Sequence, residues 1–287
     1  AKGYAREIRR KDGGVVLMHA LHVRSAALVR EVVPALIEEG YSFVRLDQMP
    51  EYRKYETPAA NAVAMVRDHA PGATLLFFGL KPEMTVVEIS PGGGYWAEIL
   101  APYAKATGGH YIAATGRADQ KLPARFLDTA IYGPVHYTVL SKDSGVLGPA
   151  NSADLVLTAR NIHNWIMGGF AEKAMKDFYA VLKPGGILAV EEHRADPRPE
   201  AANVATGYVS TRHVIELATR AGFRLEAQSE INANPKDTKD HPFGVWTLPP
   251  SRQSNENNKP SPAGFNRAHY DAIGESDRMT LRFRKPG

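Results

Sequence analysis

The sequence of 287 residues contains no cysteine. This absence excludes disulfide bonds, thiolate metal sites and a cysteine nucleophile, and it leaves the redox compartment open. The chain also lacks any apolar run close to the roughly 18–20 residues that a membrane-spanning helix requires. We therefore expect no membrane partner.

An excess of charge of one sign is also missing. The formal net charge is only +4, and the one dense basic segment is "REIRRK" at 6–11. Because nucleic-acid-binding proteins usually carry a basic face or stripe, we expect no nucleic-acid partner. The chain begins with Ala1 and its start does not have the pattern of a signal peptide, so we expect it to be a processed or excised piece.

What the sequence does contain is a long alternation of apolar strands and amphipathic helices. The expected strands are 85–89, 110–115, 135–140, 153–159, 187–192, 223–231 and 279–284. The expected helices are about 59–69, 72–79, 95–104, 120–130, 169–182 and 210–221. Such alternation predicts an α/β fold with a mostly parallel sheet and helices on both faces. The strands at 223–231 and 279–284 are expected to close it as an antiparallel edge.

The chain is expected to have three parts. Residues 1–50 form a small β-α-β appendage, 51–61 a polar linker, and 62–287 the main domain, with a long excursion at 232–278 before the last strand. A β-α-β unit has two faces to cover, and fifty residues cannot cover them alone. This favours a homo-oligomer formed through the appendage.

A glycine-rich segment, "SPGGG" at 90–94, follows the first strand of the main domain. In open parallel sheets, ligands bind beyond the carboxyl ends of the strands. Gly92 and Gly94 permit backbone angles and a close approach that other residues forbid, and the next helix offers free N–H groups. The spacing matches neither a dinucleotide motif nor a phosphate-binding P-loop. The segment alone is either a ligand cradle or an ordinary turn.

Three segments taken together are more specific. "LKPEMTVVEISPGGG", "ADLVLTARNIHNW" and "VLKPGGILAVEE" resemble the class I S-adenosylmethionine-dependent methyltransferases, over about residues 57–287. The form "PGGGYWAEILAPY" resembles a bacterial, poorly characterised branch of that family. The resemblance implies a Rossmann-like three-layer α/β/α sandwich, S-adenosylmethionine as the cofactor and a small-molecule methyl acceptor.

The resemblance also implies where the cofactor binds. The acid before the loop supports the methionine end, the glycines line the site and an aspartate after the third strand faces the adenine. The expected cofactor-binding residues are Glu88, Ser90, Pro91, Gly92, Gly93, Gly94, Thr115, Asp143 and Asn161. The family usually has an acid at the end of the second strand for the ribose, whereas here Thr115 stands there and the first acid is Asp119.

Polar residues after the fourth and fifth strands are the catalytic candidates. Methyl transfer requires alignment of donor and acceptor, and removal of a proton from a hydroxyl or amine acceptor. His163 is a candidate base because histidine ordinarily titrates near neutral pH; alternatively it is a packed loop residue. Glu192 and His193 stand where the acceptor usually enters, and with His163 and Glu191 they also suit a metal ion. Since sequence supplies no ligand geometry, no metal ligand is assigned.

The acceptor is expected to contact residues near these candidates. The expected substrate-binding residues are Asn164, Trp165, Tyr208 and Trp246.

The N-terminal segment 13–47 resembles a different family. It is similar to the last β-α-β unit of a polysaccharide deacetylase (NodB-like) domain, whose Leu-x-His strand is present as "LMH" with His19. That family's catalytic aspartate and metal-binding histidines lie upstream and have no counterpart here. His19 and His22 have a spacing that allows a shared metal, but a structural remnant is the favoured interpretation.

Three functions therefore stay open. The first is a methyltransferase acting on a small molecule, the second a cofactor-binding module without transfer, and the third a fragment or fusion partner of polysaccharide deacetylation. Cofactor supply favours the cytoplasm, and a periplasmic or exported location is the alternative.

Overall fold

The computed structural model describes residues 70–196, 204–256 and 259–287. Contacts divide the chain into two units, Ala1–Glu56 and Thr57–Gly287, and the described residues all belong to the second. The expected appendage with His19 and His22, the linker and the helix at 59–69 lie outside the described residues.

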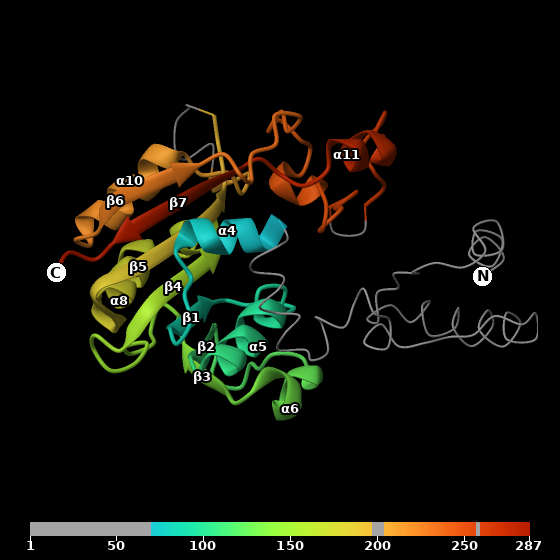
Figure 1. Ribbon diagram of the computed structural model, residues 1–287. Coiled ribbons are helices and arrows are strands. Elements are labelled where there is room, and N and C mark those ends of the chain that lie inside the picture. The colour runs from blue at the N-terminus through green and yellow to red at the C-terminus, as the bar shows by residue number, and fades with distance from the viewer. Residues whose placement is uncertain (1–69, 197–203, 257–258) are drawn as a thin grey trace, which may run out of the picture. The chain divides into compact units, whose positions relative to one another are not determined.

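The described residues form one seven-stranded sheet with helices on both sides (Figure 1). The strand order is β3-β2-β1-β4-β5-β7-β6, and neighbouring strands are parallel except at β7, which is antiparallel to both neighbours. The strands are β1 Thr85–Ile89, β2 His110–Thr115, β3 Val135–Val139, β4 Ala153–Ala159, β5 Leu182–His193, β6 Arg224–Ser229 and β7 Arg278–Arg284. The expected mostly parallel α/β sheet is thus confirmed.

The last two strands close the sheet as an antiparallel edge, as expected. β7 lies between β5 and β6, and β6 is the edge. The reason is burial: Met279, Leu281 and Phe283 of β7 are at most 1% exposed, whereas β6 alternates exposed and half-buried residues. The apolar terminal strand is therefore paired on both sides.

The helices also differ from expectation in several places. They are α4 Ala70–Phe78, α5 Ala97–Thr107, α6 Thr129–Tyr132, α7 Ile162–Met167, α8 Ala171–Val181, α10 Thr211–Arg220 and α11 Arg267–Ile273, with short 3₁₀ helices η3 Ala124–Leu127 and η4 Gly244–Thr247. The helix expected at 120–130 is wrong: Asp128 ends η3 and caps α6 by accepting a hydrogen bond from the Ala130 N–H. The short helix α7 was not expected.

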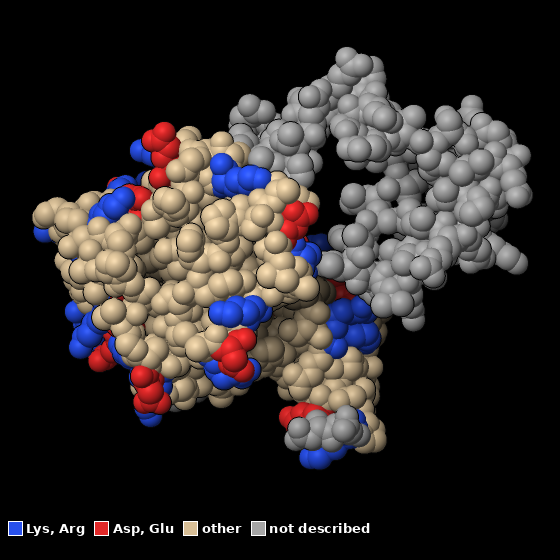
Figure 2. All heavy atoms as spheres, turned by 90° about the horizontal axis from the view of Figure 1, so that it is seen from below, with Lys and Arg blue, Asp and Glu red and all other residues tan. Residues whose placement is uncertain are grey.

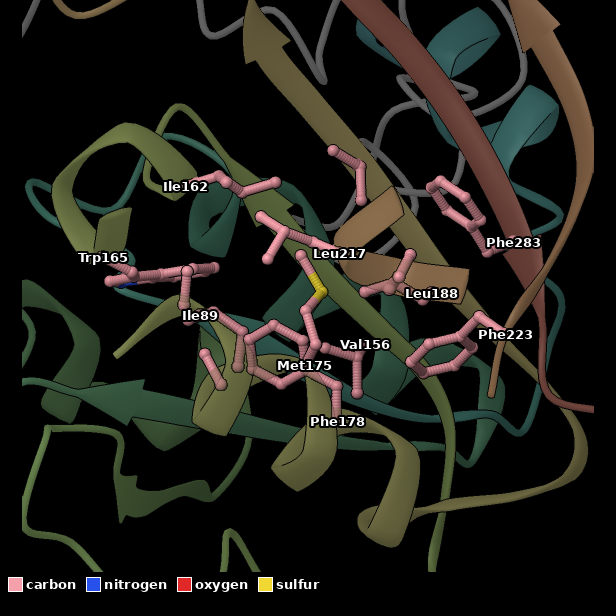
Figure 3. Close-up of a cluster of buried hydrophobic side chains, with 14 of the residues drawn as sticks. Ile89, Val156, Ile162, Trp165, Met175, Phe178, Leu188, Leu217, Phe223 and Phe283 are labelled. Atoms are coloured by element: carbon pink, nitrogen blue, oxygen red, sulfur yellow. The ribbon is translucent and has the colours of Figure 1, made fainter. Parts of the chain in front are cut away.

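Two apolar cores cover the two faces of the sheet. One joins α4 and α5 to residues such as Tyr111 and Leu155 of the strands. The other joins α8 and α10 to the opposite face, where Met175, Phe178 and Leu217 converge (Figure 3). Because successive strand residues point to opposite faces, the central strands β1, β2, β4 and β5 contribute to both cores.

No described helix is both long and apolar enough to cross a membrane. On the described surface in Figure 2, Lys and Arg side chains are interspersed with Asp and Glu.

Candidate functional site

The strand order places a switch point at the carboxyl ends of β1 and β4. The chain runs from β1 outward through β2 and β3, and then returns to β4 on the other side of β1. Ligands of open α/β sheets bind at such a point. The residues that leave these two strands, Ser90 and Arg160, have left-handed φ angles of 50° and 60°. Such angles are uncommon outside glycine, so both strand exits are held by their surroundings.

Asn161 links the two strand ends. Its side-chain amide donates hydrogen bonds to the carbonyls of Ala159 at 2.8 Å and Ile89 at 3.3 Å. The amide nitrogen is thereby used within the protein. The part of Asn161 that can meet the expected cofactor is its side-chain oxygen.

The glycines after β1 fall into two kinds. A Cβ at Gly94 would lie 2.7 Å from the Phe126 ring, so this glycine is required by packing. A Cβ at Gly92 or Gly93 would meet nothing within 4 Å, and the φ of Gly92 is +55°. In the described part of the chain, the N–H groups of Gly92 and Gly93 have no hydrogen-bond partner. The loop therefore offers open space and two free donors, which fits a cofactor cradle.

Glu88 lies beneath this loop on β1. Its side chain is buried, and its Oε2 accepts a hydrogen bond from the Tyr111 hydroxyl at 2.6 Å. Burial raises the pKa of Glu88 from 4.5 to about 8, and the Tyr111 hydrogen bond opposes this only in part. Glu88 is therefore mostly protonated at neutral pH in the protein without ligand.

Glu88→Gln is expected to remove a pH dependence of stability. Between pH 4.5 and 8 the folded protein holds a proton that the unfolded chain has lost, so wild-type stability falls as pH rises through this window. Glutamine is neutral throughout and can still accept the Tyr111 hydrogen bond. The variant should match the wild type near pH 4.5 and exceed it by about 3 kcal/mol at pH 7. Urea unfolding from pH 5 to pH 8 measures this, and parallel curves would contradict it.

On the expected ribose side of the site, the polar groups at the end of β2 and after it are already bonded to other residues of their own loop. Thr115 is buried and its hydroxyl donates to the Arg117 carbonyl at 2.9 Å. Asp119 is exposed and pairs with Arg117 at 3.2 Å. Asp143 is exposed in the turn after β3, where the adenine is expected. The hydroxyl of Thr115 is thus engaged with the backbone of its own loop.

A buried cluster of His163, Glu192 and His193 lies where β4 and β5 end. His163 is on α7, and its Nδ1 lies 3.0 Å from Glu192 Oε1. The same oxygen accepts from the His193 N–H at 2.9 Å, and Oε2 accepts from the Ile162 N–H at 2.5 Å. Because the Glu192 carboxyl accepts from two backbone donors, its orientation is fixed by α7 and β5.

His193 is oriented from the opposite side. Its Nδ1 lies 2.6 Å from the Ser276 hydroxyl, and its ring centre is 5.3 Å from that of His163. Burial, with smaller contributions from the charges of His163, Arg278 and Arg160, holds the pKa of His193 well below its usual value. This imidazole is therefore neutral at physiological pH.

Two of the expected substrate-binding residues border the cluster. Trp246, in η4, has its ring centre 6.0 Å from that of His163, and Tyr208 lies 6.3 Å from His193. Tyr208 is fixed by Asp237, whose carboxylate accepts from the Tyr208 hydroxyl and lies 2.7 Å from His241 Nε2. The excursion before β7 thus packs against the site and supplies part of its wall.

The other two expected substrate residues lie elsewhere. Trp165 is 4% exposed and packs in the core, with its ring centre 5.5 Å from that of Phe178 (Figure 3). Its expected place in the substrate wall does not fit this position, because apolar neighbours enclose the indole. Asn164 is exposed on α7.

A polar cavity of about 800 Å³ lies next to the cluster, past the end of β5. Arg194, Lys239 and Asp277 line it, and Asp277 pairs with both cations at 2.9 Å. This network ties the excursion to β5. The charged groups of the lining neutralise one another, so the cavity itself indicates no particular ligand.

The structure adds residues that the sequence did not single out. Tyr95 is 60% exposed directly after the glycines, and burial and the charges of Glu191 and Glu275 raise its pKa. The charge of half-buried Arg160 acts in the opposite direction on the pKa of Tyr95 and also contributes to the lowered pKa of His193. Tyr95 could have been predicted as a site residue from the sequence, because it directly follows the glycines. Ser276 could not, because it is 83 residues away from His193 in the chain.

Known proteins resemble this chain in part of its sequence and in its fold. No family model matches the chain. The ubiquinone/menaquinone biosynthesis C-methyltransferase UbiE of Hydrogenovibrio crunogenus is 28% identical over 134 residues, which cover 45% of this chain and 50% of the relative. The chain thus spans about half the length of the curated relative it matches.

Solved structures of similar fold are more distant in sequence. The [4+2]-cyclase SpnF has a TM-score of 0.53 and 17% identity, covering 75% of this chain and 80% of its own. The 1,6-didemethyltoxoflavin-N1-methyltransferase of Burkholderia thailandensis, crystallised with S-adenosylhomocysteine, has a TM-score of 0.47 and 13% identity, covering 96% of this chain and 95% of its own.

The described sheet has the expected Rossmann-like arrangement, and the SpnF structure shares this fold. The relative matched in sequence is a C-methyltransferase.

Proposed function

We propose that this protein binds S-adenosylmethionine over Gly92 and Gly93 and transfers its methyl group to a small-molecule acceptor. One observation carries the proposal: the buried His163–Glu192–His193 cluster lies at the ends of β4 and β5, beside the switch point that the open glycine loop borders. The UbiE relative supports the same class of reaction.

The residues present fit such a cofactor. Gly92 and Gly93 leave room for a ligand and present two free N–H donors. Asn161 contributes its side-chain oxygen between β1 and β4. Glu88, buried below the loop, becomes a favourable partner for a cationic group when it ionises. When bound, the cofactor supplies an electrophilic methyl group on a sulfonium.

His163 then acts on the acceptor. It takes the proton that a hydroxyl or amine loses as it gains the methyl group, and Glu192 stabilises the resulting imidazolium through Nδ1, as an acid orients the base in a catalytic triad. Trp246 and Tyr208 wall the acceptor side of the cluster. Neutral His193 completes the wall without adding a positive charge next to the imidazolium.

The test has two stages. Calorimetric titration with S-adenosylmethionine and S-adenosylhomocysteine is expected to show saturable binding of both. Formation of S-adenosylhomocysteine is then measured with a panel of hydroxyl, amine and carbon-acid acceptors. Absence of binding at near-millimolar cofactor would overturn the proposal, and binding without turnover on the whole panel would leave a cofactor-binding module.

A further inference from the structure

The same cluster has the composition of a metal site. His163, Glu192 and His193 are each at most 7% exposed. One potential ligand atom from each of the three lies within 4.8 Å of the other two. Within the part of the chain that the structure describes, this is the one group of three such residues. Imidazole and carboxylate together suit Zn²⁺ and other divalent transition metals.

The distances within the cluster match a shared ion. Ligand atoms on a tetrahedral ion with bonds of roughly 2.0–2.1 Å are about 3.3 Å apart, and His163 Nδ1 lies 3.0 Å from Glu192 Oε1, close to this spacing. Two imidazoles on one such ion have ring centres about 5 Å apart, and those of His163 and His193 are 5.3 Å apart.

His193 and Glu192 are also held in place by hydrogen bonds from neighbouring groups, as metal ligands usually are. Ser276 occupies the Nδ1 side of His193, which leaves its Nε2 for an ion. Glu192 is held by the backbone N–H groups of Ile162 and His193. A solvated surface group needs no such support, whereas a ligand needs a fixed direction.

We propose that His163, Glu192 and His193 bind one divalent transition-metal ion, His193 through Nε2. The role of the ion rests on the proposed function: a bound ion would replace the His163 Nδ1–Glu192 hydrogen bond and would activate the acceptor in place of a base at His163. It would hold the oxygen or nitrogen of the methyl acceptor between Trp246 and Tyr208 and lower the pKa of that group. The acceptor would then release its proton to solvent more readily than an unbound one. The ion sits on the acceptor side of the site, and binding of the ion does not require the cofactor.

The first experiment uses the wild-type chain stripped with a chelator, without cofactor or acceptor. Calorimetry with Zn²⁺ and absorption spectroscopy with Co²⁺ are expected to show one equivalent bound. Because the chain has no cysteine, the visible Co²⁺ spectrum reports nitrogen and oxygen ligands without thiolate bands. Absence of stoichiometric binding would overturn the proposal.

Variants then locate the ion. His163→Gln and His193→Gln are each expected to weaken Zn²⁺ binding by more than about 100-fold, and Ser276→Ala by about 10- to 100-fold, the usual effect of losing an outer partner. His110→Gln and His136→Gln are the matched controls, since this exposed pair has ring centres 6.5 Å apart and should not change the affinity. Retained affinity in the double variant of His163 and His193 would contradict the assignment.

If the buried variants do not fold, X-ray absorption of the zinc-loaded wild type decides. Two imidazoles in the first shell are expected, and fewer than two would overturn the site. The cofactor is absent from these titrations, so failure to bind metal leaves methyl transfer standing. Failure to bind S-adenosylmethionine, in turn, leaves the metal site standing and removes only the role given to the ion.

Discussion

Gly92→Asp is expected to weaken S-adenosylmethionine binding by at least about 100-fold while the protein stays folded. The φ of Gly92 is +55°, and aspartate tolerates this left-handed region at a cost of roughly 1–2 kcal/mol. A Cβ at Gly92 meets no atom within 4 Å, so the new side chain points into open space. In our proposal the cofactor occupies that space, and the aspartate carboxylate would exclude it.

Gly185→Asp is the matched control for this variant. Gly185 also has a left-handed φ, +78°, with nothing within 4 Å of a Cβ, but it lies at the opposite end of the sheet, near the start of β5. The two variants should lose similar stability in urea unfolding, and only Gly92→Asp should lose cofactor affinity in calorimetry. Equal affinity of Gly92→Asp and the wild type would remove the glycine loop from the cofactor site.

His163→Ala is expected to reduce turnover by about 100-fold or more, the usual contribution of a general base, and to change cofactor affinity by less than about twofold. His163 faces Glu192 and Trp246 on the acceptor side of the cluster, so the variant removes proton transfer and spares the glycine loop. Steady-state kinetics together with calorimetry measure the two effects separately.

His269→Ala, at an exposed position on α11, is the control and should keep full activity. A fully active His163→Ala would contradict the role of His163. Assays with and without a chelator add a distinction, because direct proton transfer to His163 survives chelation and activation by a bound ion does not.

The strands were the most predictable part of the fold. The boundaries of β1, β2 and β4 agree with the expected 85–89, 110–115 and 153–159. Buried parallel strands are short apolar runs bounded by glycine, proline and polar residues, and that signal is local in the chain. The helix expected at 120–130 was wrong because Asp128 caps a new helix inside that segment.

The candidate site was predictable in parts. The glycine loop and the polar residues after β4 and β5 were expected because they follow strands of a parallel sheet, and Glu88 was expected from the family resemblance. Their roles stay predictions. The sequence could not distinguish the two tryptophans that were expected to bind the substrate. Trp165 packs against Phe178 in the core, whereas Trp246 lies beside His163.

By itself, the sequence determined the fold class, most strand positions and the glycine-rich turn after β1, because each follows from residues close together in the chain. Only the tertiary structure decided that Glu192 orients His163, that Ser276 orients His193, and that β7 lies between β5 and β6. These contacts join residues 29 and 83 positions apart. Such proximity is set by strand order and packing, for which no local pattern of polar and apolar residues carries information.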